Sequence, residues 1–158
     1  MSVERYIPVG GNKLHVLIEG NADRPWITLL HGAATNLHLW DAQIAPLAKL
    51  FHILRIDVRG HGKSTADIVA NSFEDLVADV IAVWDALGIR KSTVMGLSLG
   101  GMTGFGIAIH HPDRIRETRP DYVLLLPWNL TDEITKQMSY IRDWNGRFVV
   151  PIPEVKIL

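Results

Sequence analysis

The residues Gly96-Leu97-Ser98-Leu99-Gly100 match the pattern G-x-S-x-G. In this pattern a serine occupies a sharp turn between a strand and a helix, and its hydroxyl is exposed above the sheet. The flanking sequence agrees, since the β-prone run Thr93-Val94-Met95 precedes the motif and a predicted helix follows it. The pattern therefore predicts a nucleophile elbow at Ser98.

A serine site of this kind also needs hydrogen-bond donors for the oxygen that becomes negatively charged in the transition state. The backbone N–H of Leu99 stands beside Ser98 at the start of the predicted helix. A second donor is suggested by His31-Gly32-Ala33, which directly follows an apolar strand. Together the two segments predict an oxyanion hole.

The decisive residue is the base, because a serine hydroxyl is a weak nucleophile until an adjacent group accepts its proton. The seven histidines are His15, His31, His38, His52, His61, His110 and His111. The last two follow Ser98 in one helix and lie roughly 18 Å or more from it at 1.5 Å per residue. His15 and His52 are predicted at the opposite end of the sheet. None of these four can reach the serine.

Three histidines remain as candidates. His31 and His61 lie in glycine-containing loops and are predicted to be structural, whereas His38 follows the third strand on the correct side and is the least implausible substitute base. Asp132 and Glu154 follow predicted strands, but without a histidine to orient, a third member of a triad has no role. The sequence predicts a nucleophile that lacks its base.

Composition excludes several other classes of function. The 158 residues include 16 Lys and Arg, 17 Asp and Glu and no Cys, with a net charge of −1. Such a balance argues against a nucleic-acid partner, and the lack of cysteine excludes disulfides and a thiolate zinc site. The first residues do not fit a secretory signal, and no apolar run approaches the roughly 20 residues of a membrane helix. We expect a cytoplasmic protein with no cofactor, no metal and no membrane partner.

Short apolar runs alternate with helix-length stretches after an N-terminal hairpin that turns at Gly10-Gly11-Asn12. The predicted strands cover residues 5–9, 14–18, 26–30, 51–58, 92–97, 122–126 and 147–150, and the predicted helices cover 42–50, 73–87, 99–111 and 132–144. Ser72 and Asp75 can cap the second helix, and Thr131 can cap the last, which Gly146 follows. The pattern predicts a single three-layer αβα domain whose mostly parallel sheet has about seven strands.

Residues 1–115 resemble the α/β-hydrolase superfamily, and more narrowly its 3-oxoadipate enol-lactonase and carboxylesterase branch. The resemblance rests on His31-Gly32 with Trp40, on the string from Asp57 to Ser64 (DVRGHGKS), on the motif from Gly96 to Met102, and on the string from His111 to Arg114 (HPDR). It implies Ser98 as the nucleophile, Ala33 and Leu99 as the oxyanion donors, and a small ester or lactone as the substrate.

The remainder of the chain departs from that family. The strings from Arg119 to Asn129 (RPDYVLLLPWN) and from Gly146 to Val155 (GRFVVPIPEV) resemble the C-terminal segment of S-adenosylmethionine-dependent sugar C-methyltransferases, without the glycine-rich loop that would bind a cofactor. The resemblance implies a recombined, engineered domain of residues 1–158, with a hydrolase-like segment 1–117 and a strand-helix-strand segment 118–158. We expect a scaffold with little or no activity; the alternative is a weak ester or lactone hydrolase that uses Ser98. An exposed sheet edge predicts a homodimer or strand exchange.

Overall fold

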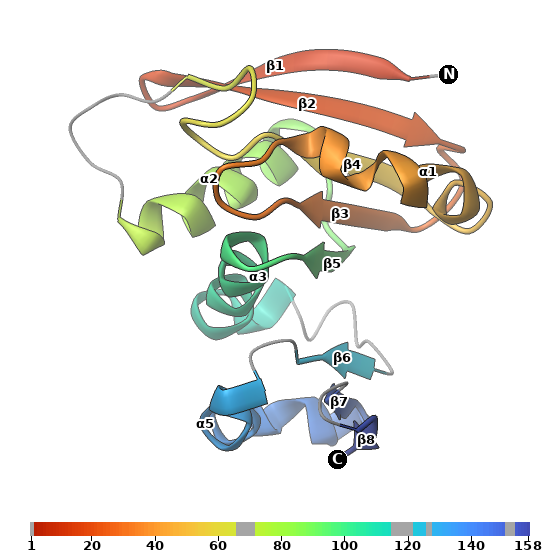
Figure 1. Ribbon diagram of the computed structural model, residues 1–158, viewed down its shortest axis with the longest axis vertical. Coiled ribbons are helices and arrows are strands. Elements are labelled where there is room, and N and C mark those ends of the chain that lie inside the picture. Colours follow the sequence, from red (N-terminus) through yellow and green to blue (C-terminus); the bar gives the residue numbers. More distant parts are fainter. Residues whose placement is uncertain (1, 66–71, 115–121, 126–127, 151–153) are drawn as a thin grey trace.

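In the computed structural model the described residues are 2–65, 72–114, 122–125, 128–150 and 154–158 (Figure 1). The strands are β1 (Val3–Val9), β2 (Asn12–Gly20), β3 (Trp26–Leu30), β4 (His52–Ile56), β5 (Ser92–Gly96), β6 (Tyr122–Leu124), β7 (Arg147–Val150) and β8 (Lys156–Ile157). The helices are α1 (Asp41–Leu47), α2 (Phe73–Ala86), α3 (Leu99–His110) and α5 (Thr131–Gln137), with the 3₁₀ helices η1 (Leu37–Trp40), η2 (Trp128–Leu130) and η3 (Ser139–Trp144). This content confirms the predicted α/β class.

The predicted N-terminal hairpin is present, and its turn is one residue shorter than expected. β1 and β2 pair antiparallel with Val9 opposite Asn12, so Asn12 already belongs to the second strand. The two linking residues are glycines, and Gly10 has a φ of 56°. A positive φ is inexpensive only for glycine, which explains why this turn contains no larger side chain.

The central strands bring three loops to one edge of the sheet. β3 lies between β4 and β5 and is parallel to both, with Leu30 opposite Ile56 on one side and opposite Gly96 on the other. Because the carboxyl ends of parallel strands then lie at the same edge, the loops that follow β3, β4 and β5 meet there. This edge holds the predicted site.

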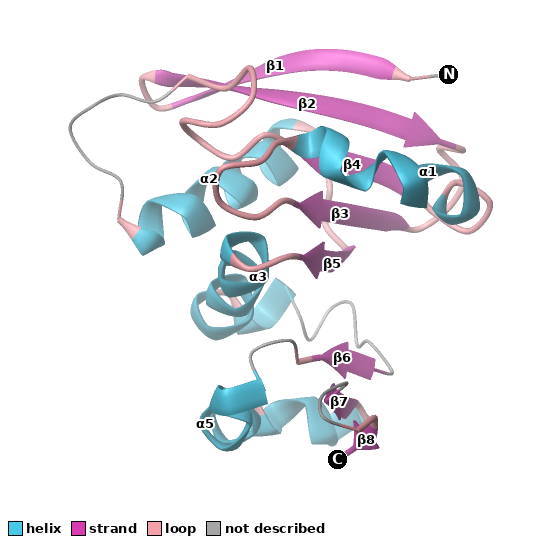
Figure 2. Cartoon of the chain, viewed as in Figure 1, coloured by secondary structure: helices cyan, strands magenta, loops and turns pink. Residues whose placement is uncertain are grey.

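Helices cover both faces of this sheet, as the three-layer prediction requires (Figure 2). On one face α1 packs over a cluster that includes Leu29 and Ile53, and on the other α2 and α3 pack over Leu30 and Leu54. α2 begins with the predicted capping box, in which Ser72 accepts from the Asp75 N–H and Asp75 accepts from the Ser72 N–H. Its apolar stripe is buried, with Trp84 among the largest enclosed side chains.

The expectation of one sheet of about seven strands is wrong for the described residues. The structure has a five-stranded mixed sheet in the order β1-β2-β4-β3-β5 and a separate three-stranded sheet in the order β6-β7-β8. β6 pairs with β7 in parallel, with Val123 opposite Phe148. α3 bridges the two sheets, because Ile107 belongs to the first core cluster and Ala108 to the second. A short apolar run does not specify which neighbour it pairs with, and β8 has too little pattern to be predicted.

The helix predicted over 132–144 is interrupted. α5 ends at Gln137 and η3 begins at Ser139. Met138, between the two helices, and Ile141, within η3, are both buried in the same core cluster. Thr131 is the first helical residue rather than the cap, and the left-handed stop is Asn145, with φ 64°, instead of Gly146.

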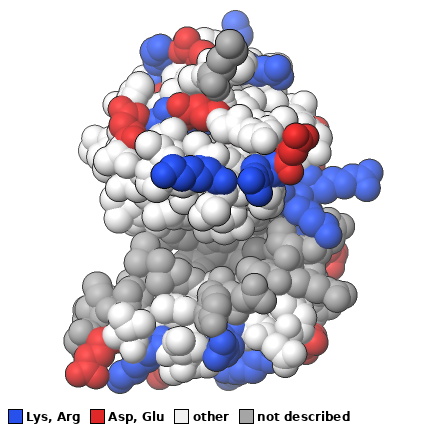
Figure 3. Space-filling model, turned by 90° about the vertical axis from the view of Figure 1, so that its right-hand side faces the viewer, with Lys and Arg blue, Asp and Glu red and all other residues white. Residues whose placement is uncertain are grey.

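Charged side chains of both signs are present on the surface. On the face shown in Figure 3, Lys and Arg side chains cluster across the middle, with Asp and Glu side chains above and below them. None of the helices within the described residues has the length and hydropathy needed to cross a bilayer.

The outer edge of β5 is the edge from which we predict association. In the described part of the chain no strand is hydrogen-bonded to β5 on the side away from β3. Unpaired backbone groups on such an edge template pairing with another chain. We expect the mean mass from light scattering to rise with protein concentration, and Thr93→Lys, which adds a charge at an exposed position of β5, to weaken that rise. A mass that stays monomeric at all concentrations would contradict the prediction.

Candidate functional site

Ser98 occupies the strained turn that the G-x-S-x-G pattern predicts. It links β5 to α3 with φ 49° and ψ −113°, a positive-φ conformation that is rare for a residue with a side chain. A Cβ at Gly96 would lie 2.3 Å from the Gly100 carbonyl carbon, and one at Gly100 would lie 2.2 Å from the Leu30 carbonyl oxygen. Only glycine fits at either flank, so the turn can close and leave Ser98 exposed to solvent.

The loop after β3 lies directly against this turn. A Cβ at Gly32 would lie 3.6 Å from the Ser98 Cβ and 3.4 Å from the Leu97 carbonyl oxygen. The Leu97 N–H donates to the Leu30 carbonyl at 3.1 Å, which fixes the start of the turn to the end of β3. The structure therefore brings the two segments predicted to form the oxyanion hole together. Leu99 is the first residue of α3, and the N–H groups of a first helical turn have no partner within the helix.

His31 is close to the turn, but both of its ring nitrogens are occupied. Its Nε2 accepts from the Val58 N–H at 3.1 Å, so the proton sits on Nδ1, which donates to the Gly32 carbonyl at 2.8 Å. The ring is fully buried, and burial lowers the pKa of His31 below its ordinary value. This side chain is a neutral brace between two loops, as predicted, and has no nitrogen left to accept a proton from Ser98.

Three more histidines have side-chain partners other than the serine. His38, the least implausible substitute base, is exposed, with Nδ1 3.2 Å from the Asp41 carboxylate. The His61 Nδ1 donates to the Arg59 carbonyl at 3.0 Å, and His52 stacks on Trp26. All seven histidines lie within the described residues, and no hydrogen bond joins any of them to the Ser98 hydroxyl.

The predicted third members of a triad are not placed for such a role either. Asp132 lies in the first turn of α5, and its backbone carbonyl accepts from the Thr135 hydroxyl. Glu154 is exposed just before β8. Within the described residues neither carboxylate contacts a histidine.

A buried carboxylate, which sequence reasoning did not single out, organises the loops around the site. Asp57 is 2% exposed and accepts from the Leu37 N–H at 2.7 Å, from the Lys63 N–H at 2.9 Å and from the His15 ring at 2.7 Å. The other ring nitrogen of His15 lies 2.7 Å from a Glu4 carboxylate oxygen. The signal for this network was present in the DVRGHGKS string, but nothing in that string reveals that His15 of β2 is its partner.

The pKa of Asp57 predicts an acid-sensitive contribution to stability. Burial alone would raise this pKa, but the N–H groups of Lys63 and Leu37 and the ring of His15 together lower it below its ordinary value of 3.8. A depressed carboxyl pKa contributes stability above the unfolded-state pKa and loses it as the pH falls through the folded-state value.

We expect Asp57→Asn to lower the free energy of unfolding near pH 7 by about 3 kcal/mol, because one partner of a buried charged network is lost. We also expect the variant to lose less stability than the parent as the pH falls below about 4. Urea unfolding at a series of pH values measures both. Parallel pH profiles in parent and variant would show that the Asp57 carboxylate does not titrate as described.

The comparison with protein families decides what kind of chain this is. The model of the alpha/beta hydrolase fold family matches residues 25–147. The chain belongs to this family. The match includes Ser98 and both segments of the predicted oxyanion hole. It also continues past residue 118, so most of the segment that resembles a methyltransferase is matched by the hydrolase family, and the comparisons give no support for a methyltransferase origin.

Similar hydrolases include lactonases and esterases. 3-Oxoadipate enol-lactonase 2 of Acinetobacter baylyi is 39% identical over 98 residues, which cover 62% of this chain and 37% of that protein. An uncharacterized carboxylesterase, nap, of Bacillus subtilis is 32% identical over 112 residues, which cover 70% of this chain and 37% of that protein. The crystal structure of the enol-lactonase from Burkholderia xenovorans superimposes with a TM-score of 0.70 at 30% identity, covering 90% of this chain and 67% of that one. This chain thus spans less than two fifths of the length of both curated relatives.

Proposed function

We propose that this chain supplies the nucleophile and the oxyanion donors of a carboxylic-ester or lactone hydrolase site, and that by itself it has little or no hydrolytic activity. The observation that carries the proposal is the strained, exposed Ser98 beside a histidine whose two nitrogens are both engaged. Relatives named as an enol-lactonase and a carboxylesterase support the substrate class.

The proposed chemistry is nucleophilic acyl transfer. The Ser98 oxygen would attack the carbonyl carbon of the ester, the oxygen of that carbonyl would become negative, and the N–H groups of Ala33 and Leu99 would donate to it. The serine proton must leave as the new bond forms, and a nearby base normally accepts it. Without that base the attack is slow, because the neutral hydroxyl is a weak nucleophile.

A weak hydrolase is the second candidate, and the geometry of the elbow favours it over a fully inert scaffold in one respect. Oxyanion donors and substrate binding alone retain about 10³-fold acceleration over water when a serine triad is broken. The exposed hydroxyl and the N–H of Leu99 at the start of α3 are the parts that such residual catalysis needs.

The test combines turnover of p-nitrophenyl acetate with covalent labelling by a fluorophosphonate. We expect near-background turnover, and slow labelling that disappears in Ser98→Ala. Ser139→Ala, which removes another exposed hydroxyl, is the matched control. Fast turnover that needs Ser98 would show that a base acts on the serine after all, and labelling that survives in Ser98→Ala would remove Ser98 from the site.

The origin of residues 118–158 is a separate proposal. Their resemblance to a methyltransferase segment, and the recombined, engineered chain that it implies, rest on the residue strings alone. The hydrolase family match to residue 147 favours a continuous hydrolase chain instead. Either origin leaves the proposed chemistry at Ser98 unchanged.

A further inference from the structure

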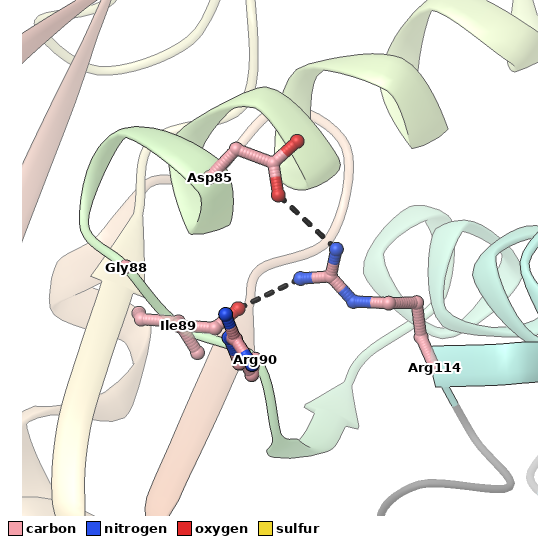
Figure 4. Close-up of a pocket in the computed structure, with 5 residues that line it drawn as sticks. All are labelled: Asp85, Gly88, Ile89, Arg90 and Arg114. Carbon is pink, nitrogen blue, oxygen red and sulfur yellow. Dashed lines mark hydrogen bonds and ion pairs between the residues drawn. The ribbon is translucent and has the colours of Figure 1, made fainter.

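A pocket, drawn in Figure 4, lies near the amino end of β5, at the opposite end of that strand from Ser98. It has a volume of about 340 Å³ and is lined by Asp85, Gly88, Ile89, Arg90 and Arg114. Arg90 precedes the amino end of β5, whereas Ser98 follows the carboxyl end of the same strand. The pocket is therefore distinct from the proposed hydrolase site.

The guanidinium of Arg114 is held in place at this pocket. One of its terminal nitrogens donates to the Asp85 carboxylate at 3.1 Å and the other donates to the Ile89 carbonyl at 2.7 Å. The same group lies 5.5 Å from the centre of the Trp84 ring, where a cation–π attraction adds to the restraint. A guanidinium has five N–H donors, and these two bonds leave three without a partner in the described part of the chain. The Nε–H is buried, so Arg114 is preorganised and keeps one N–H on each terminal nitrogen for a ligand.

Arg90 supplies the second positive charge and has no carboxylate partner among the described residues. It is exposed, and no Asp or Glu among the described residues forms an ion pair with it. This contrasts with Arg59 and Lys63 at the other end of the strands, which are paired with Asp79 and Glu4. Among the described residues that line the pocket there are thus two arginines and one carboxylate, that of Asp85.

We propose that this pocket binds the phosphate group of a small molecule, held between Arg90 and Arg114. Planar guanidinium groups match the oxygens of phosphate in pairs of hydrogen bonds. A monoanionic carboxylate would compete with Asp85 for Arg114 on equal terms, whereas a phosphate dianion carries the larger charge and is favoured. The volume exceeds that of a single ion and falls in the range of small-molecule sites, which leaves room for the remainder of the ligand.

The test uses inorganic phosphate as the probe, titrated into the full chain at constant ionic strength and followed by amide NMR shifts. At about pH 8, above the second pKa of inorganic phosphate, the probe is mostly a dianion. We expect saturable shifts at residues 88–90 and 114. Arg90→Gln should raise the dissociation constant about tenfold or more, the loss typical of a hydrogen-bonded charge pair. Arg114→Lys keeps the charge and should also weaken binding, because an ammonium group cannot donate the two parallel hydrogen bonds of a planar guanidinium.

Two further variants separate a site from a general effect of charge. Asp85→Asn removes the competing carboxylate and should tighten phosphate binding several-fold. Lys13→Gln removes one exposed positive charge at the start of β2, which is antiparallel to β4 and therefore begins at the opposite end of the sheet from the pocket, and it should leave the dissociation constant unchanged. Equal weakening by Lys13→Gln and Arg90→Gln, or shifts that do not saturate, would overturn the proposal.

Discussion

Free imidazole will accelerate the fluorophosphonate labelling of Ser98 by about tenfold or more. The hydroxyl is exposed and sits on a strained turn, and no base within the described residues contacts it, so a base from solution can approach it. Positioned general bases contribute about 10²- to 10⁴-fold, and a diffusing one should recover part of that range. The labelling rate is measured by intact-protein mass spectrometry as imidazole is raised at constant pH and ionic strength.

The pH dependence of this rescue identifies its chemistry. Only neutral imidazole accepts a proton, so the rescued rate should rise with pH through about 6 to 8 and then level off, near the ordinary pKa of an imidazole. Ser98→Ala should show no labelling at any imidazole concentration. A labelling rate that is fast without imidazole and insensitive to it would mean that the serine already has a base.

Gly100→Ala will be the most damaging single-methyl substitution in the elbow. The added Cβ would lie 2.2 Å from the Leu30 carbonyl oxygen and 2.5 Å from its carbon, which are backbone atoms of the central strand and cannot rotate away. Overpacking of a core usually costs 1 to 3 kcal/mol, and a clash with backbone lies at or above the top of that range. We expect a loss of about 3 kcal/mol or more in the free energy of unfolding, measured with urea.

Gly101→Ala is the matched control for this prediction. It adds the same methyl group one position further along α3, where the nearest atom outside the helix is the Gly96 carbonyl oxygen at 3.3 Å. Alanine is favoured over glycine in a helix by about 1 kcal/mol, which offsets the tight contact. Its free energy of unfolding should therefore stay within about 1 kcal/mol of the parent's. Equal midpoints for the two alanine variants would refute the close packing of Gly100 on β3.

Local patterns predicted the elements of the sheet and the elbow well. Residues 26–30 and 147–150 form strands with the expected bounds, and the Ser72 capping box begins α2 where the spacing of its side chains requires. The G-x-S-x-G motif predicted a turn that only glycine flanks allow, and Ser98 has the required positive φ. These features depend on residues within a few positions of each other, so the sequence alone can specify them.

The sequence did not predict which strands pair or which residues far apart in the chain form hydrogen bonds. β6 lies beside β7 in a second sheet, although its apolar run is equally compatible with a place next to β5. The network that joins Glu4, His15 and Asp57 spans three separated segments. Because His15 lies beside Asp57 at the carboxyl end of β4, the prediction that it stands at the opposite end of the sheet from the serine is wrong. Hydrogen bonds between such distant residues depend on how the strands are aligned. The residue types alone therefore do not predict them.

The sequence by itself determined that Ser98 lies on a strand-to-helix turn. The two glycines that flank it, Gly96 and Gly100, have no Cβ to prevent the turn from closing, and this depends only on residues close to the serine in the chain. Only the tertiary structure decided that the serine has no imidazole partner. His31 precedes the neighbouring loop and could have offered a free nitrogen. The packing of β3 against β4 instead directs the Val58 N–H at Nε2 and leaves Nδ1 bonded to Gly32, so both nitrogens are occupied.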